Sequence, residues 1–223
     1  MQSIAHIHTE FPTKFGVPRQ SGLAESLRGT IVFTPPYRNP DALRGIEGFS
    51  HIWLIWQFHK ALREGFSPTV LPPKLGGKTR VGVFATRSPF RPNAIGLSSV
   101  RLLGVELHTP DGPVLHVAGA DLVDGTPIFD IKPYLPYADC HVDATDAFAD
   151  TRRDTPLNVV FPDEWLCMIP EDKREALFEV LALDTRPGYQ HDPARRYGFN
   201  YAGFDVRFTI DDGTLTVVEV VKL

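Results

Sequence analysis

The 223-residue sequence predicts a mainly β protein, α+β overall, in which antiparallel strands close into a barrel or stack as a sandwich. Two observations lead to this prediction. Short segments of alternating apolar and polar residues are separated by Gly, Pro, Asn and Asp turn signals about every 8–12 residues, which is typical of all-β domains. In addition, the chain has no GxGxxG fingerprint, so the sequence does not indicate a Rossmann fold.

The first part of the chain supplies three predicted strands and one loop. Ser3–Thr9 and Leu27–Phe33 alternate in polarity and are expected to be strands, whereas Lys14–Leu23 contains Gly and Pro and is expected to be a loop. His51–Phe58, with the sequence HIWLIWQF, is almost wholly apolar and is therefore predicted to be a buried central strand. Core packing is the expected role of its two tryptophans.

A long connection and a stiff basic loop follow. Ala61–Lys78 has too little periodicity for a helix, and a loop of this length is expected to be functional, for example as a lid. Val81 is expected to open a strand that leads into Arg87–Asn93, where Pro89 and Pro92 restrict the backbone. The two arginines of this loop are therefore preorganised for a phosphate or a carboxylate.

The next strands are predicted to form hairpins. Gly96 is expected to permit the close approach of backbone or ligand, and Leu97–Leu103 to return as a strand, so that the basic loop forms a site on a sheet edge. Gly104–Gly119 predicts a hairpin around Thr109–Pro113, and Asp124–Pro127 predicts a second tight turn before another strand.

The pattern changes in the last third of the chain. The segment from Asp139 to Pro156 is polar and is expected to be a linker, which predicts domains at 1–145 and 155–223. Pro162–Leu183 contains the single convincing helix, and a loop is expected over Thr185–Asn200. A closing hairpin is predicted from Phe204–Ile210 and Leu215–Val221.

Composition indicates a reduced cytoplasmic protein. Hydrophobic residues make up 43% and charged residues 22% of the chain. No apolar run of about 18 residues occurs, so no membrane-spanning helix is expected, and the first residues do not resemble a signal peptide. Cys140 and Cys167 are far apart and outside any CxxC motif, so neither a disulfide nor a structural zinc site is expected.

The distribution of charge restricts where a nucleic acid would bind. The net charge of −4 argues mildly against a nucleic-acid partner. However, residues 1–140 hold 14 Lys and Arg against 11 Asp and Glu, a net charge of +3, whereas residues 141–223 hold 9 against 16, a net charge of −7. Any footprint of an RNA should therefore centre on the first part of the chain.

Four ordered motifs and one weaker match resemble the TsaA-like family, whose characterised members are called TrmO. They are KFGVPRQSGL from Lys14, IEGFSHIWLIWQFHK from Ile46, RSPFRPNAIGLSSVRL from Arg87, DLVDGTPIFDIKPYLPYAD from Asp121 and, more weakly, DPARRYGFNYAGFDVRF from Asp192. Together they cover most of the chain. The resemblance implies a β-barrel that uses S-adenosylmethionine to methylate N6 of threonylcarbamoyl-adenosine at position 37 of tRNA, beside the anticodon, and that forms a homodimer.

The resemblance also assigns roles by position. The methyl donor is expected to contact the following residues: Pro18, Arg19, Gln20, His59, Lys60, Arg87, Leu97, Asp124, Gly125, Thr126 and Pro127. Several of these would act through backbone atoms. The alternative to donor binding by Asp124 is that this residue only forms the Asp-Gly turn.

The acceptor amine is a poor nucleophile, so a residue that accepts its proton or hydrogen-bonds it is expected. The catalytic candidates are Asp130, Tyr134 and Lys132, and Asp124 is a further candidate for the proton acceptor. Lys132 is also a candidate for phosphate or carboxylate binding. Substrate binding is expected from Arg91, Asn93, Arg195, Arg196 and Tyr197, with Tyr189 as a further base-stacking candidate. Arg87 and Arg91 remain alternatives for the carboxylates of the donor and of the threonylcarbamoyl group.

Two other functions are compatible with the sequence. One is a barrel methyltransferase that acts on a small molecule or a protein, and the other is a binding module without turnover. No metal site is expected: His6 and His8 share one face of a predicted strand, but no third ligand lies nearby in the sequence.

Overall fold

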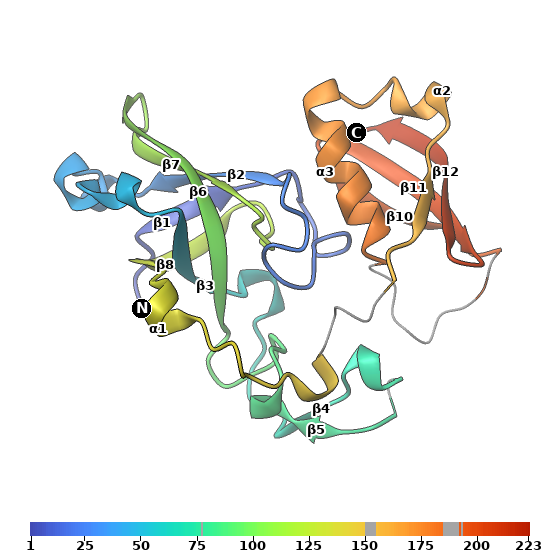
Figure 1. Cartoon of the computed structure of the whole chain (residues 1–223), viewed down its shortest axis with the longest axis horizontal. Helices are drawn as coiled ribbons and strands as arrows, with labels where there is room; N and C mark the ends of the chain where they lie inside the picture. The colour runs from blue at the N-terminus through green and yellow to red at the C-terminus, as the bar shows by residue number, and fades with distance from the viewer. Residues whose placement is uncertain (77, 150–154, 185–191, 193) are drawn as a thin grey trace.

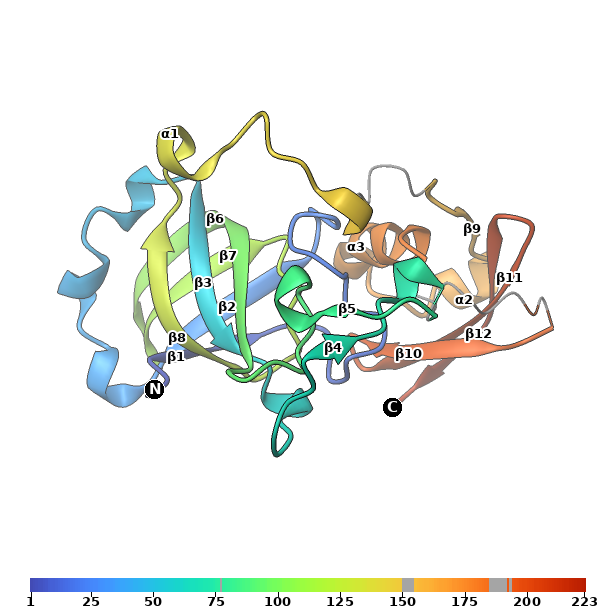
Figure 2. The same ribbon diagram turned by 90° about the horizontal axis from the view of Figure 1, so that it is seen from below.

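The computed structural model describes residues 1–76, 78–149, 155–184, 192 and 194–223. Figures 1 and 2 show a β-barrel on one side and a smaller sheet-and-helix unit on the other, with the loop that follows the first strand between them. Within the described residues, no helix has the length and apolar character needed to cross a membrane.

The barrel confirms the antiparallel prediction and excludes the sandwich. Its strands follow the closed order β1-β2-β7-β6-β3-β8, and every neighbouring pair is antiparallel. Because the sheet closes on itself, the expected site on a sheet edge is wrong, and the basic loop lies beside the barrel instead. The strands are β1 Ala5–His8, β2 Arg28–Phe33, β3 His51–Gln57, β6 Ile95–Thr109, β7 Gly112–Ala118 and β8 Thr126–Pro133.

Strand β3 lies between β6 and β8, as predicted for a central strand, but only one of its faces is buried. Ile52, Leu54 and Trp56 point into the barrel core, where none is more than 7% exposed. On the outer face, the Trp53 ring lies 5.5 Å from the ring of Tyr134, and its Nε1 donates to Asp139 at 2.9 Å. The outward apolar residues of β3 are therefore covered locally by the segment after β8 rather than by a second layer.

The connection between β3 and β6 has more local structure than predicted. The two-residue strands β4 Thr69–Val70 and β5 Val81–Gly82 pair as a separate ribbon. The strand expected to continue from Val81 is wrong, because Val83–Ala85 forms a 3₁₀ turn. Strand β6 joins the predicted strand Leu97–Leu103 and the first arm of the predicted hairpin into one strand, with register shifts near Gly104 that let it bend. The other short 3₁₀ turns are Pro35–Tyr37, Pro40–Leu43, Ile46–Gly48, His59–Ala61, Pro73–Leu75 and Ala147–Ala149.

The C-terminal unit packs one helix on a four-stranded sheet of order β10-β11-β12-β9, in which β9 is parallel to β12. The predicted helix and closing hairpin are confirmed. Part of the predicted Thr185–Asn200 loop is instead strand β10, because Tyr197, Phe199 and Tyr201 alternate toward the core. The elements are α1 Pro136–Asp139, which precedes this unit, β9 Asn158–Val160, α2 Asp163–Leu166, α3 Glu171–Ala182, β10 Tyr197–Tyr201, β11 Phe204–Asp211 and β12 Thr214–Lys222.

The loop after β1 belongs to the hydrophobic core of the C-terminal unit. Phe11, Ala24 and Leu27 are buried there together with residues of α3 and of the sheet. Gly16 has φ +91°, and a Cβ atom at this position would lie 2.5 Å from the Phe199 ring. Polar contacts reinforce the packing, since the Ala202 amide donates to the Glu10 carbonyl at 3.0 Å. The segment Lys14–Gln20, called here the Gly16 loop, is thus held against the C-terminal sheet.

Candidate active site

A cavity of 230 Å³, called here the Arg87 cavity, lies where the Gly16 loop meets one end of the barrel. Most of the residues expected to contact the methyl donor line it. They come from the Gly16 loop, the end of β3, the basic loop, the start of β6 and the β7–β8 connection. The lining members of the predicted set are Pro18, Arg19, Gln20, His59, Lys60, Arg87, Leu97 and Thr126.

The inner wall of the Arg87 cavity depends on the contact between Trp56 and Gly96. These residues are paired across β3 and β6, and a Cβ atom on Gly96 would lie 2.3 Å from Cε2 of the indole. The close approach expected at Gly96 is therefore made by a side chain of the protein. Trp56 Nε1 donates to Ser98 Oγ at 2.9 Å, and Ser98 Oγ donates to Asp121 Oδ1 at 2.6 Å.

Sequence reasoning did not select Asp121, although it also lines the Arg87 cavity. Burial raises the pKa of its carboxyl group, while the hydrogen bond from Ser98 and the charge of Arg87 act in the opposite direction. The signal that could have identified it is Ser98, because a polar residue on the inward face of an apolar barrel strand requires a buried partner.

The rim of the Arg87 cavity is basic. Arg87 Nη1 donates to Gln20 Oε1, which ties the basic loop to the Gly16 loop. Lys60 Nζ donates to the Pro12 carbonyl at 2.5 Å. Burial and the neighbouring Lys60 lower the pKa of His59, so a neutral imidazole lines the cavity at pH 7. The rim therefore offers fixed cations and a neutral imidazole to an anionic ligand.

The Asp124–Pro127 turn closes the barrel and contributes one residue to the lining. Asp124 Oδ1 accepts from the Thr9 amide at 3.1 Å and lies 3.2 Å from His8 Nδ1, so the carboxylate holds the end of β1. The Gly125 amide donates to the Ile7 carbonyl at 2.9 Å. Of the four turn residues, Thr126 lines the cavity and the other three do not.

The catalytic candidates Asp130, Lys132 and Tyr134 lie elsewhere. Lys132 Nζ and Asp130 Oδ2 form a partly exposed ion pair at 2.9 Å. Tyr134 packs on the outer face of the barrel, with its ring 6.2 Å from the imidazole of His51. None of the three is among the residues that line the Arg87 cavity.

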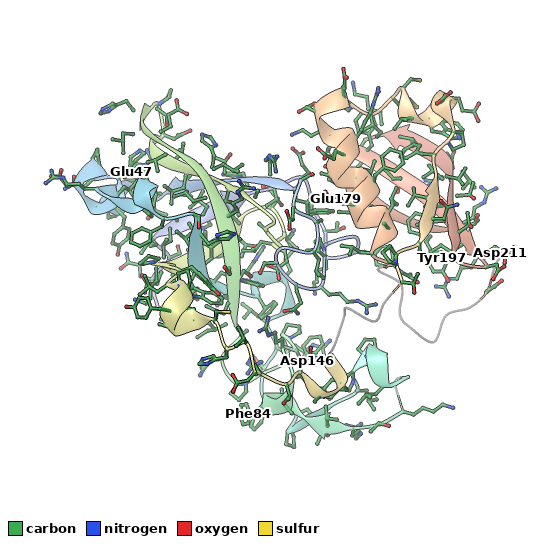
Figure 3. All side chains as sticks on the ribbon, viewed as in Figure 1. Glu47, Phe84, Asp146, Glu179, Tyr197 and Asp211 are labelled. Atoms are coloured by element: carbon green, nitrogen blue, oxygen red, sulfur yellow. The ribbon has the colours of Figure 1, made fainter. Side chains whose placement is uncertain are left out.

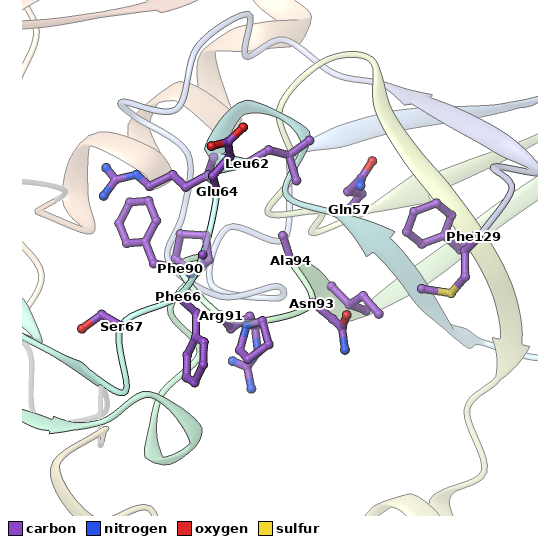
Figure 4. A pocket seen from close by; sticks show the side chains of 17 residues that line it. Gln57, Leu62, Glu64, Phe66, Ser67, Phe90, Arg91, Asn93, Ala94 and Phe129 are labelled. Atoms are coloured by element: carbon purple, nitrogen blue, oxygen red, sulfur yellow. The ribbon is translucent and has the colours of Figure 1, made fainter.

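Two further depressions adjoin the Arg87 cavity at Pro89, which lines all three. The Arg91 cavity, of 630 Å³, is lined by Arg91 and Asn93, as Figure 4 shows. The Arg63 guanidinium, which also lines it, covers the Phe90 ring at 3.8 Å. Arg91 Nη1 also donates to the Thr86 carbonyl at 3.0 Å. The structure thus separates the two arginines that the sequence left as alternatives, because they line different cavities.

The second depression, called here the Arg80 groove, has a volume of 990 Å³. It shares Arg19, Gln20 and Arg87 with the Arg87 cavity, and Arg63 and Arg80 add further cations. The linker residues that form its other wall are Thr145, Asp146, Phe148 and Ala149. Figure 3 shows Asp146 near the β4–β5 ribbon. The groove therefore continues the basic rim away from the barrel.

The candidates in the C-terminal unit are placed less favourably. Arg195 and Arg196 are exposed, but Tyr197 is only 7% exposed and stacks on Phe208 with ring centroids 5.9 Å apart. The ring of Tyr197 is therefore not available to stack on a base. Tyr189 lies outside the described residues. Within the described part of the chain, no group of three or more His, Cys, Asp or Glu residues is placed to hold a metal ion.

Comparisons with known proteins indicate the same family over nearly the whole chain. The profile described as the tRNA-methyltransferase O N-terminal domain matches residues 6–140, and the TrmO C-terminal domain profile matches residues 155–223. The chain is 42% identical over 224 residues to the tRNA (adenine(37)-N6)-methyltransferase of Escherichia coli, covering 97% of this chain and 95% of that protein. It is 41% identical over 217 residues to a putative S-adenosylmethionine-dependent methyltransferase, RcsF, of Pseudomonas aeruginosa, covering 92% and 90%. A crystal structure of TrmO from Pseudomonas aeruginosa superposes with a TM-score of 0.79 at 36% identity and covers 98% of this chain and 97% of that chain.

Proposed function

The chain belongs to the TrmO family of tRNA methyltransferases, and from this premise we propose how its residues carry out the reaction. It is an S-adenosylmethionine-dependent enzyme that methylates N6 of adenine 37 in tRNA. The observation that supports placing the reaction in the Arg87 cavity is the convergence there of the Gly16 loop, the end of β3 and the basic loop.

The Arg87 cavity fits the chemistry of the methyl donor. S-adenosylmethionine supplies an electrophilic methyl group on a sulfonium, together with an ammonium, a carboxylate and an adenine ring. Arg87 offers a guanidinium for the carboxylate, and Asp121 adds a carboxyl group to the same wall. Trp56, Phe58 and Leu97 give an apolar wall for a ring. We propose that Arg87, rather than Arg91, holds the donor carboxylate.

The Arg80 groove is the proposed path of the tRNA strand. It adjoins the Arg87 cavity, and both depressions are lined by Arg19 and Arg87. Cations along a groove neutralise phosphates without reading sequence, which suits an enzyme that needs one nucleotide placed at its donor. We further propose that Arg195 and Arg196 contact the anticodon stem-loop, since both are exposed on the C-terminal unit.

The Arg91 cavity is the proposed place of the threonylcarbamoyl group of the substrate. We propose that the threonylcarbamoyl group is required and that its carboxylate enters the Arg91 cavity, where Arg91 and Asn93 offer donors beside Pro89. We also propose that the enzyme works in the cytoplasm, where its tRNA substrate is found. We further propose that residues 1–145 and 155–223 form two domains.

Arg87→Ala is expected to weaken donor binding about 10-fold, the effect of losing about 1.4 kcal/mol of interaction. The purified protein is incubated with labelled S-adenosylmethionine and tRNA from cells with and without the threonylcarbamoyl modification, and donor affinity is measured by calorimetry. Label is expected to enter only modified tRNA. Arg44→Ala is the matched control, because Arg44 is exposed and pairs with the neighbouring Asp41 on a turn remote from the lining of the Arg87 cavity.

Two outcomes of this experiment would contradict the proposals separately. If the wild-type protein binds the donor but labels no tRNA, the tRNA activity is contradicted. That result would favour a small-molecule or protein acceptor, or a binding module without turnover. Unchanged donor affinity in Arg87→Ala would remove the assignment of Arg87 while leaving the activity in place.

We propose that two copies pair through the outer face of β3 and β6. Leu97 and Leu103 are 55% and 45% exposed on β6, and the packed rings of Trp53 and Tyr134 lie on the neighbouring outer face. Exposed apolar side chains next to aromatic rings are characteristic of an interface. Because Leu97 also lines the Arg87 cavity, such an interface would adjoin the reaction site.

Light scattering after size-exclusion chromatography is expected to give twice the chain mass of 24.9 kDa. Leu103→Asp is expected to give the mass of a single chain, because a charge buried at the interface is strongly unfavourable. Leu223→Asp, at an exposed chain end, serves as the control and should leave the dimer intact. A monomeric wild-type protein would exclude the proposed dimer.

A further inference from the structure

Asp121 is a largely buried acid in the wall of the Arg87 cavity to which the proposed function has so far given only a general role. It lies in the connection between β7 and β8, next to the inward-facing side of β6. Ionisation of a buried carboxyl group is unfavourable, so a buried acid in the wall of a ligand cavity is a candidate for a functional role.

The hydrogen bonds around Asp121 distinguish its two carboxyl oxygens. The Trp56 indole N–H can only donate, so Ser98 Oγ must accept from it at 2.9 Å. The single hydroxyl hydrogen of Ser98 is then directed to Asp121 Oδ1, at 2.6 Å. Oδ1 therefore already accepts a hydrogen bond in both protonation states, which leaves Oδ2 as the more available oxygen for a proton that Asp121 takes up.

Burial and the charged and polar groups around Asp121 have opposite effects on the pKa of its carboxyl group. Burial raises the pKa of the carboxyl group and is the largest influence. The Ser98 hydroxyl, the backbone amides of Asp121 and Ser21, and the charge of Arg87 lower it. The remaining titratable groups that line the cavity are Lys14, Arg19, His59 and Lys60. A carboxyl group held between such influences can be ionised and still accept a proton, which is what a general base near neutral pH requires.

We propose that Asp121 accepts the proton that leaves N6 of the target adenine as the methyl group arrives. This inference rests on the proposed function and deepens it. The N6–CH₃ bond forms as the S–CH₃ bond breaks, and the sulfonium becomes a neutral thioether. The electron pair of the N6–H bond stays on N6, and the proton moves to Oδ2 of Asp121. The proton then leaves to water at the rim of the Arg87 cavity. Ser98 and Trp56 are positioning residues in this scheme.

The test is a single-turnover methylation assay of the full-length protein at saturating S-adenosylmethionine and modified tRNA, over a range of pH. For the wild type, the rate is expected to rise with pH through an acid limb that reports Asp121. In Asp121→Asn the rate is expected to fall about 100-fold and the acid limb to disappear. The affinity for S-adenosylhomocysteine is expected to change less than twofold. Asp111→Asn, in the exposed β6–β7 turn, is the matched control and should behave as the wild type.

Stability provides a check that the Asn variant is folded. Folding raises the pKa of Asp121, so ionisation of this group lowers stability as pH rises from the unfolded-state pKa through the folded-state pKa. Removing the charge is therefore expected to leave the melting temperature at pH 8 unchanged or higher. If the Asn variant fails to fold, Ser98→Ala tests the same idea. Loss of the hydrogen bond that lowers the pKa of Asp121 should move the acid limb to higher pH, and an unmoved limb would overturn the proposal.

The outcomes separate this inference from the proposed function. If wild-type protein labels tRNA and Asp121→Asn labels it equally fast at saturation, the proton-acceptor role is overturned and the activity stands. The role is also overturned if the variant binds S-adenosylhomocysteine at least tenfold more weakly but turns over normally once saturated, because Asp121 would then only hold the donor. If the wild type binds the donor but labels no tRNA, the proposed function fails and this inference fails with it.

Discussion

Gly96→Ala is expected to lower the free energy of unfolding by about 3 kcal/mol and to abolish measurable donor binding. The added methyl group would lie 2.3 Å from Cε2 of Trp56, so the indole or the β6 backbone must shift within the packed barrel core. Displacing the indole also breaks its hydrogen bond to Ser98, and the inner wall of the Arg87 cavity is lost.

A matched control for Gly96→Ala lies on the same strand. A Cβ atom on Gly104 would meet no atom within 4 Å, so Gly104→Ala should change stability by less than about 0.5 kcal/mol and leave binding intact. Urea unfolding and calorimetry with S-adenosylhomocysteine measure both quantities. Equal behaviour of the two variants would show that the contact between Trp56 and Gly96 does not shape the cavity.

Phe199→Ala is expected to lower the free energy of unfolding by about 3–5 kcal/mol and also to weaken donor binding, although Phe199 does not line the Arg87 cavity. Phe199 is 3% exposed, and its ring centroid lies 6.4 Å from that of Phe11 and 6.0 Å from that of Phe208. It also supports Gly16, so its removal leaves a void beneath the Gly16 loop. The loop that carries Gln20 would then no longer be held in place.

Phe84→Ala separates this effect from the general loss of an aromatic ring. Phe84 is 75% exposed, so its removal should change the free energy of unfolding by less than about 0.5 kcal/mol. Urea unfolding gives the stability of each variant, and donor affinity is measured below the unfolding transition. A Phe199→Ala protein that is less stable but binds the donor with wild-type affinity would show that the C-terminal unit does not support the loop.

The sequence predicted most elements of the barrel because alternation and turn residues act over short distances. The hairpin at Thr109–Pro113 and the closing hairpin were found in this way and are confirmed. The same signal failed for Val81–Ala85, where an alternating pattern covers a two-residue strand and a 3₁₀ turn. It also failed for β10, where arginines and glycines concealed the inward alternation of three aromatic residues.

The candidate site was harder to predict because closure of the barrel decides which residues meet. The resemblance to a family identified Arg87 and Gln20, which the structure joins although they are far apart in the sequence. Asp121 was missed because its role depends on a contact with Ser98 across strands, 23 residues away in the chain. Asp130 and Lys132 were selected by residue type, but their position on β8 places them outside the cavity.

The contact between Gly16 and Phe199 couples ligand binding at the Gly16 loop to the folding of the C-terminal unit. Any ligand that binds only the ordered Gly16 loop must also favour the folded sheet beneath it, since the loop and the sheet share one hydrophobic cluster. By the same linkage, a partner that binds the C-terminal unit and shifts this packing changes the affinity for the donor by some factor. The donor then changes the affinity for that partner by the same factor. Residues of the C-terminal sheet that touch no substrate can therefore alter how tightly the barrel holds its cofactor.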